Sequence, residues 1–179
     1  MSASGEGFSI LSRRRFLGLA LSTGSVVLMG GVGSLFALRG CAPDVAGLGA
    51  LTPHEYRTLS KLAEALLPEG GAFPPGARGS DLATAFDRFL ADEPPWNRSD
   101  LKKALFLLEF GPVLYERRAV TFSHLDVAER LAHFERWSTS ERLLRRQVAL
   151  AFRKFLSLVF YDRPEVWPYI GYDGPLGGL

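Results

Sequence analysis

The stretch ERLLRRQVALAFRKFLSLVF, residues 141–160, decides the fold class of this chain. At 100° per residue, its apolar side chains fall on one side of a helix and its arginines on the other. The apolar side comprises Leu144, Val148, Ala151, Phe152, Phe155, Leu158 and Val159, and the opposite side comprises Arg142, Arg145, Arg146 and Arg153. The arginines form either a solvated face or a surface for an acidic protein or lipid headgroups. Ser138 and Glu141 have the spacing of a capping box, so we expect a helix from there to about Phe160.

The same periodicity recurs upstream. Thr52 to Glu55 has the form of a capping box with proline at the first helical position, followed by apolar residues at intervals of three and four. Further helices are expected over residues 81–92, from Ser99 or Asp100 to a bend or stop at Gly111-Pro112, and over residues 123–137. No stretch alternates as a strand does. The sequence therefore predicts an all-α domain over residues 51–179, a small bundle of about five helices.

Residues 1–41 have a different character. No charged residue occurs over residues 16–38, and these 23 positions are enough to span a membrane as a helix. Three arginines precede this run and only Arg39 follows it, which favours a cytoplasmic N-terminus. Glycine and serine residues within the run lower its hydropathy. The sequence predicts a signal or membrane helix, followed by a linker over residues 42–50.

The start of this run resembles a bacterial twin-arginine export signal. The pair Arg13-Arg14 is followed by one free position and then by Phe16-Leu17, in the order that such signals use. The pathway they address carries proteins that have already folded. The alternative is an ordinary basic region before a membrane helix.

Cys41, the only cysteine, follows Leu38, Arg39 and Gly40 in an imperfect lipoprotein box, where Arg39 replaces a small residue. It is either a lipid attachment site or an incidental thiol at the end of an anchor helix, and it can form no internal disulfide.

Charge and motifs limit the chemistry of the domain. After Cys41 the chain carries 17 basic and 18 acidic residues, and this near-neutral balance argues against a nucleic-acid partner. Zinc, haem and dinucleotide motifs are missing, and His124 and His133 would lie on opposite sides of one helix. We therefore expect no catalytic residue, no metal and no cofactor in this chain.

The tail YDRPEVWPYIGYDGP, residues 161–175, is rich in aromatic residues and proline, unlike a disordered tail. Either it caps the core or it is a docking surface, since Trp and Tyr dominate binding at interfaces. The predicted partner interface comprises Tyr161, Pro164, Trp167, Tyr169, Ile170, Gly171 and Tyr172, with Trp167 as its main anchor.

Together these features resemble the gluconate 2-dehydrogenase subunit 3 family. The likeness rests on residues 12–17, on LTPHEYRTLSKLAEALLP from Leu51, and on the ending from Pro164 to Pro175. It implies a non-catalytic periplasmic subunit that binds a large FAD-dependent dehydrogenase, aids its maturation and directs its folded export by the twin-arginine translocase. It also implies a multihaem cytochrome in some complexes, and attachment to the inner membrane through the N-terminal helix or a lipid on Cys41. The alternative is a free-standing, membrane-tethered enzyme or ligand-binding helical domain.

Overall fold

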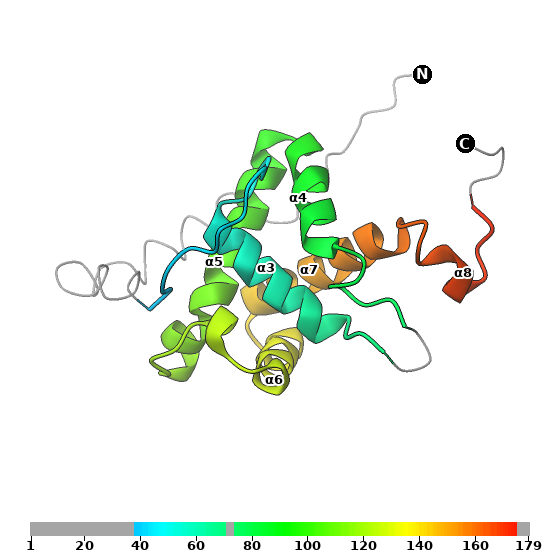
Figure 1. Cartoon of the computed structure of the whole chain (residues 1–179). Helices are drawn as coiled ribbons and strands as arrows, with labels where there is room; N and C mark the ends of the chain where they lie inside the picture. Colours follow the sequence, from blue (N-terminus) through cyan, green and yellow to red (C-terminus); the bar gives the residue numbers. More distant parts are fainter. Residues whose placement is uncertain (1–37, 71–73, 175–179) are drawn as a thin grey trace, which may run out of the picture.

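The computed structural model describes residues 38–70 and 74–174, and within these ranges every regular element is a helix (Figure 1). The predicted all-α class is therefore confirmed for the described residues. The predicted export residues Arg13, Arg14, Phe16 and Leu17 lie outside them.

The central helix is α3, Pro53–Leu66, which begins as predicted. The Thr52 hydroxyl accepts a hydrogen bond from the Glu55 N–H at 3.4 Å, and the Glu55 carboxylate accepts one from the Thr52 N–H at 2.8 Å. This capping box satisfies two N–H groups that a helix start leaves unpaired. The partners of α3 are α4 (Leu82–Asp92), α5 (Pro95–Glu116), α6 (Val127–Ser138) and the 3-10 helix η1 (Phe122–His124).

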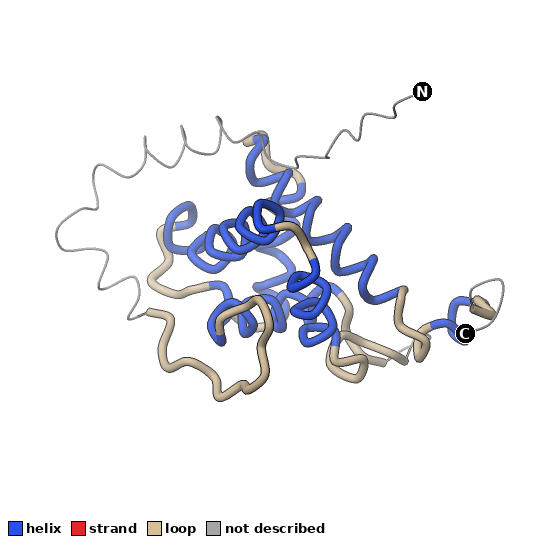
Figure 2. Tube along the Cα trace, turned by 90° about the horizontal axis from the view of Figure 1, so that it is seen from above, coloured by secondary structure: helices blue, strands red, loops and turns tan. Residues whose placement is uncertain are grey.

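Helix α7, Leu143–Tyr161, packs against α4 and α6 and completes the body. Seen from above, the helices gather into one body, and the short helix α8, Trp167–Ile170, projects beyond it (Figure 2). The interior is aromatic, and its fully buried phenylalanines are Phe86, Phe110, Phe122, Phe134, Phe152 and Phe160.

Helix α5 differs from the prediction at both ends. It begins at Pro95, ahead of Ser99 and Asp100, because the fixed φ of proline suits the first helical position. It also continues through Gly111-Pro112 to Glu116. Pro112 lacks an N–H group and so removes one helical hydrogen bond. Contacts of the last turns with His133 and Trp137 of α6 offset this loss.

The predicted starts of α6 and α7 were wrong. Ser123 lies in η1, and α6 begins after Asp126, whose carboxylate accepts from the Glu129 N–H at 2.7 Å in a second capping box. Ser138 ends α6, where its hydroxyl donates to the Phe134 carbonyl at 3.0 Å. Because that hydroxyl is used inside α6, it does not cap α7, which begins at Leu143 with no side-chain cap.

Residues 39–51, which we call the strap and which include the predicted linker over residues 42–50, lie against the body (Figure 1). The buried carboxylate of Asp87 in α4 accepts hydrogen bonds from the backbone N–H groups of Gly49, Ala50 and Leu51 at 2.6, 3.1 and 2.7 Å. At the other end, the Arg57 guanidinium donates to the carbonyls of Arg39 and Cys41. Both ends of the strap are therefore bound to helices.

Candidate partner-binding surface

The chain leaves the body at the end of α7, and residues 161–174 form a segment that we call the arm. Val166 anchors it to the core, since this side chain is fully buried, and the Val166 N–H donates to the Arg163 carbonyl at 2.9 Å within the arm. Pro168 lies in the first turn of α8, and Gly171 ends that helix with a φ of 66°, a left-handed conformation that glycine adopts without strain. The arm is thus a turn and one short helix, with Val166 buried in the body.

Trp167 organises the arm internally. Its indole N–H donates to the Tyr161 carbonyl at 3.1 Å, and its ring meets the Tyr172 ring edge-on at 5.2 Å. A Cβ built on Gly174 would lie 3.3 Å from the Trp167 ring, so the chain closes around it on a second side. The structure therefore brings Tyr161, Trp167 and Tyr172 together, and Trp167 itself is half-buried.

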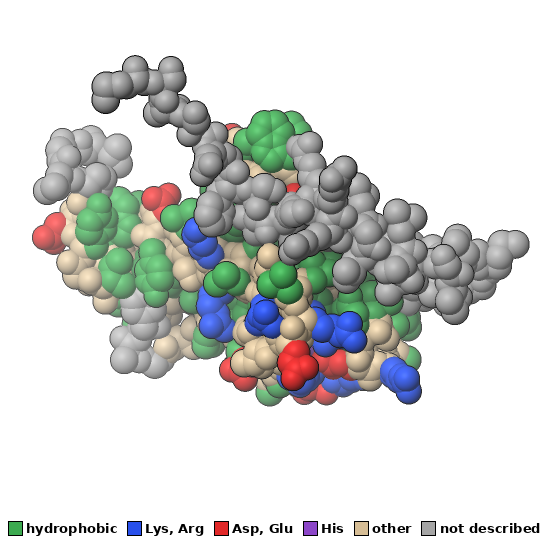
Figure 3. All heavy atoms as spheres, turned by 180° about the vertical axis from the view of Figure 1, so that it is seen from behind, with side chains coloured by type: hydrophobic (Ala, Val, Ile, Leu, Met, Phe, Trp, Pro, Cys, Tyr) green, Lys and Arg blue, Asp and Glu red, His purple; other side chains and the backbone are tan. Residues whose placement is uncertain are grey.

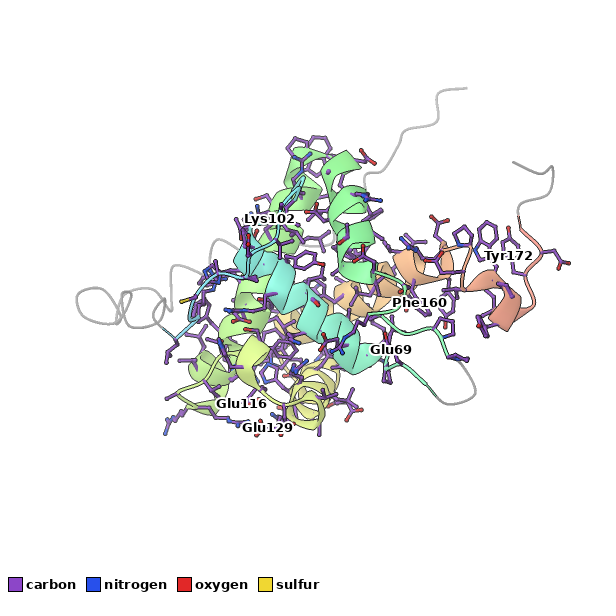
Figure 4. The ribbon with its side chains drawn as sticks, in the orientation of Figure 1. Glu69, Lys102, Glu116, Glu129, Phe160 and Tyr172 are labelled. Atoms are coloured by element: carbon purple, nitrogen blue, oxygen red, sulfur yellow. The ribbon has the colours of Figure 1, made fainter. Side chains whose placement is uncertain are left out.

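The remaining predicted interface residues point outward. The exposed fractions are 48% for Tyr161, 52% for Tyr169, 43% for Ile170 and 45% for Tyr172. Pro164 and Gly171 are exposed too. Apolar side chains gather over this end of the molecule at the left of Figure 3, and Tyr172 lies well outside the body in Figure 4. Half-exposed aromatic side chains grouped in this way are typical of binding surfaces.

The apolar surface continues from the arm along α7. Leu143, Leu150 and Leu158 are 48, 67 and 55% exposed, and at 100° per residue they share an arc of about 80° with Tyr161. We call these three leucines the α7 stripe. The prediction that Leu158 faces the core was wrong, because Leu156 and Phe160 are buried in its place. The signal that could have found the stripe is the pair Leu143 and Leu150, which lies off the predicted core side.

Two of the four arginines predicted on the polar side of α7 contact aromatic rings. The Arg145 guanidinium lies 4.1 Å from the centre of the Tyr115 ring, and that of Arg153 lies 5.7 Å from the centre of the Phe134 ring. Such cation–π contacts cover apolar surface with a charged group.

The arm contains one ion pair. The Arg163 Nε donates to a Glu165 carboxylate oxygen at 2.7 Å. Burial would raise the pKa of Glu165, but hydrogen bonds from a backbone N–H and from Arg163 outweigh it and lower that pKa. Glu165 is thus ionised at neutral pH and paired with Arg163. Because these two charges bind each other, the tyrosines are the main groups of the arm that can contact a partner.

Among the buried polar side chains elsewhere, Glu109 links three elements of the body. The Glu109 carboxylate accepts from the Thr58 hydroxyl at 3.0 Å and from the N–H and hydroxyl of Ser123 at 3.1 and 2.8 Å, which ties α5 to α3 and η1. The sequence predicted His124 and His133 on one helix, but they lie in different elements, His124 in η1 and His133 in α6. In the described ranges, no group of three or more His, Cys, Asp or Glu side chains is placed to hold a metal ion.

His133 is completely buried, and its Nδ1 lies 2.7 Å from a carboxylate oxygen of Glu116. Glu116 lies toward the lower end of the molecule in Figure 4. Burial lowers the pKa of His133, although the Glu116 carboxylate opposes this shift. Burial would raise the pKa of Glu116, but hydrogen bonds from Arg136 and His133 lower it. The ring is therefore neutral at pH 7, with its proton on Nδ1 toward Glu116.

Cys41 lies in the strap as an exposed, free cysteine. Among residues 38–70 and 74–174, no helix combines the length and the hydropathy that a membrane crossing requires.

The described geometry offers a contact surface, made of the arm and the α7 stripe. A comparison of the chain with protein-family models, with curated proteins and with solved structures found no match. The likeness to the gluconate 2-dehydrogenase subunit 3 family therefore rests on the sequence motifs.

Proposed function

We propose that this chain is a non-catalytic accessory subunit that binds a large FAD-dependent dehydrogenase, aids its maturation and directs its folded export by the twin-arginine pathway. The observation that carries the proposal is the arm, which presents half-exposed aromatic side chains at a preformed site. The sequence motifs at residues 12–17 and 164–175 supply the class of partner.

The arm is suited to binding because part of its ordering cost is met before a partner arrives. Val166 is already buried, and Trp167 already holds Tyr161 and Tyr172. An aromatic residue buries about 150–250 Å² when it is fully covered, so three half-exposed tyrosines offer roughly 300 Å². With the α7 stripe, this approaches the roughly 800 Å² that each partner contributes to a standard interface.

The export route follows from the chemistry of the partner. FAD is made in the cytoplasm, so a flavoprotein of the periplasm must bind it and fold before export. A small subunit that binds the folded flavoprotein and carries the pair Arg13-Arg14 supplies the export signal for both chains. The complex then resides in the periplasm, held at the inner membrane by the N-terminal run or by a lipid on Cys41, with a multihaem cytochrome as its electron acceptor.

The test is purification of the full chain from its native host, followed by identification of the copurified protein and measurement of its flavin. We expect a stoichiometric flavoprotein whose recovery falls at least tenfold in the variant Tyr169→Ala with Ile170→Ala. The matched control is Val127→Ala, an exposed apolar residue on α6 that should leave recovery unchanged. A chain that copurifies with no flavoprotein, or a flavoprotein retained equally by both variants, would refute the docking assignment.

A second experiment tests export separately. The double substitution Arg13→Lys with Arg14→Lys should leave both chains in the cytoplasm, since lysine lacks the fork-shaped guanidinium that the signal presents. Periplasmic dehydrogenase activity at the normal level in that variant would contradict the proposal, provided that the partner has no signal of its own. Activity of the small chain in isolation would favour the free-standing enzyme instead.

A further inference from the structure

The strap fixes where the long uncharged run meets the folded body. The run ends at Leu38, and the next residue, Arg39, is already bound, because its carbonyl accepts from the Arg57 guanidinium. The Arg39 guanidinium lies 5.9 and 5.1 Å from the ring centres of Phe106 and Phe110 in α5. The run therefore leaves the body at the exposed side of α5, with no free linker between them.

That side of α5 carries an aromatic and basic stripe. Trp96, Ser99, Lys103 and Phe106 follow one another at intervals of three, four and three residues, which places them on one side of the helix. Trp96 is 57% exposed and Phe106 is 41% exposed. We call these four residues the α5 stripe. Tryptophan and phenylalanine beside basic residues are typical of segments that lie at a membrane interface.

The charge beside the stripe is positive. A shallow pocket of about 490 Å³ borders it, and the charged residues that line this pocket are Arg98, Lys102, Lys103 and Glu55. Lys102 pairs with Glu55 at 3.2 Å and also donates to the Ala50 carbonyl of the strap at 2.9 Å, and it lies next to the strap in Figure 4. Asp100 pairs with Lys103 at 3.0 Å. With Arg39 and Arg57 included, this side of the molecule carries an excess of cations.

We propose that the α5 stripe is a membrane-contact face, which lies on an anionic phospholipid surface where the N-terminal run enters the bilayer. A bilayer is the occupant because the run is long enough to span one and because the strap holds its end on this face. Anionic headgroups match the excess of cations, and Trp96 and Phe106 reach the level of the headgroups and the first acyl carbons. The arm lies at the opposite end of the molecule from the strap in Figure 1, so it stays available to a protein partner. The inference goes beyond the proposed function and does not depend on which protein the arm binds.

The three tryptophans of the chain make the proposal testable without added probes. Trp96 lies on the α5 stripe, Trp137 is 2% exposed in the core, and Trp167 lies in the arm. The full chain is reconstituted into phosphatidylcholine vesicles with or without phosphatidylglycerol, and tryptophan fluorescence is measured with brominated phosphatidylcholine as the quencher. We expect quenching that is stronger in the vesicles with phosphatidylglycerol and that loses most of its amplitude in Trp96→Phe.

The matched control is Trp167→Phe, which should retain the quenching of the unmodified chain. Lys103→Gln should reduce the difference between anionic and neutral vesicles. Quenching that persists in Trp96→Phe and disappears in Trp167→Phe would place the arm on the bilayer and overturn the proposal. Quenching that neither substitution removes, or that is absent from both kinds of vesicle, would overturn it too.

Discussion

Gly111 allows the close approach of α5 and α6, and its replacement by alanine gives the sharpest test of the packing described above. A Cβ at this position would lie 2.7 Å from the His133 Nε2, 2.7 Å from the Trp137 Cζ2 and 3.0 Å from the His133 Cε1. Both rings are buried, and His133 is held by its hydrogen bond to Glu116. Neither ring can move away without losing a contact of its own.

The size of the effect follows from two opposing contributions. Alanine favours a helix over glycine by about 1 kcal/mol, which would stabilise α5. Overpacking a core costs about 1–3 kcal/mol, and displacement of His133 from Glu116 adds roughly 1.5–3 kcal/mol for a hydrogen bond to a charged group. We therefore expect Gly111→Ala to lower the free energy of unfolding by about 1.5–5 kcal/mol. At about 2.1 cal/mol/K per residue of unfolding entropy, a domain of about 130 residues loses roughly 4 °C per kcal/mol, so the melting temperature should fall by roughly 6–20 °C.

The assay is thermal and urea unfolding of the chain, followed by circular dichroism. The control is Trp137→Phe, which removes the ring atom that the new methyl group would meet. Because the two residues are in contact, the double variant should be more stable than the sum of the single effects predicts. An unchanged or raised melting temperature for Gly111→Ala, or strictly additive effects in the double variant, would refute this account of how α5 and α6 pack.

The remaining predictions concern pH, the strap and the arm. Burial lowers the pKa of His133 from its ordinary 6.5, so below that pH the unfolded state binds more protons than the folded state. The contribution of His133 to the free energy of unfolding is therefore complete above about pH 6.5 and decreases as the pH falls below that value. In urea unfolding measured at several pH values, the free energy of unfolding should depend less steeply on pH in His133→Gln. Asp87→Asn replaces one acceptor oxygen with a donor, which should cost about 2–3 kcal/mol in urea unfolding and make tryptic cleavage after Arg39 faster. Val166→Ala should lower stability by about 1–2 kcal/mol through lost burial, measured by thermal unfolding. Tyr169→Ala should weaken binding of a partner by about 2 kcal/mol or more, measured by calorimetry.

The sequence by itself determined the fold class and the start of α3. Apolar residues at intervals of three and four require a helix to bury them on one side, and a capping box is formed by residues only three apart, as at Thr52 and Glu55. These are local interactions, so no knowledge of the neighbouring helices is needed. The aromatic and proline content of the tail similarly predicted a segment that would not be disordered, and the arm has a short helix and one buried residue.

The tertiary structure decided which apolar side of α7 is buried. Apolar residues occur around most of this helix, and Leu156 and Phe160 lie on the same side as the arginines, so periodicity alone does not select them as core residues. Packing of α7 against α4 and α6 buries Leu156 and Phe160 and leaves Leu150 and Leu158 exposed. A similar long-range contact explains why α5 continues past Pro112, since the loss of one hydrogen bond is offset by packing that involves residues more than twenty positions later.

The strap and the role of Trp167 also depended on the tertiary structure. Asp87 binds N–H groups 36–38 residues earlier in the chain, and no local pattern in residues 39–51 records that partner. The sequence predicted Trp167 as the leading anchor for a partner, and the fold adds contacts of its indole with Tyr161 and Tyr172. The sequence shows which side chains are able to bind, but contacts such as these are set only when the chain folds.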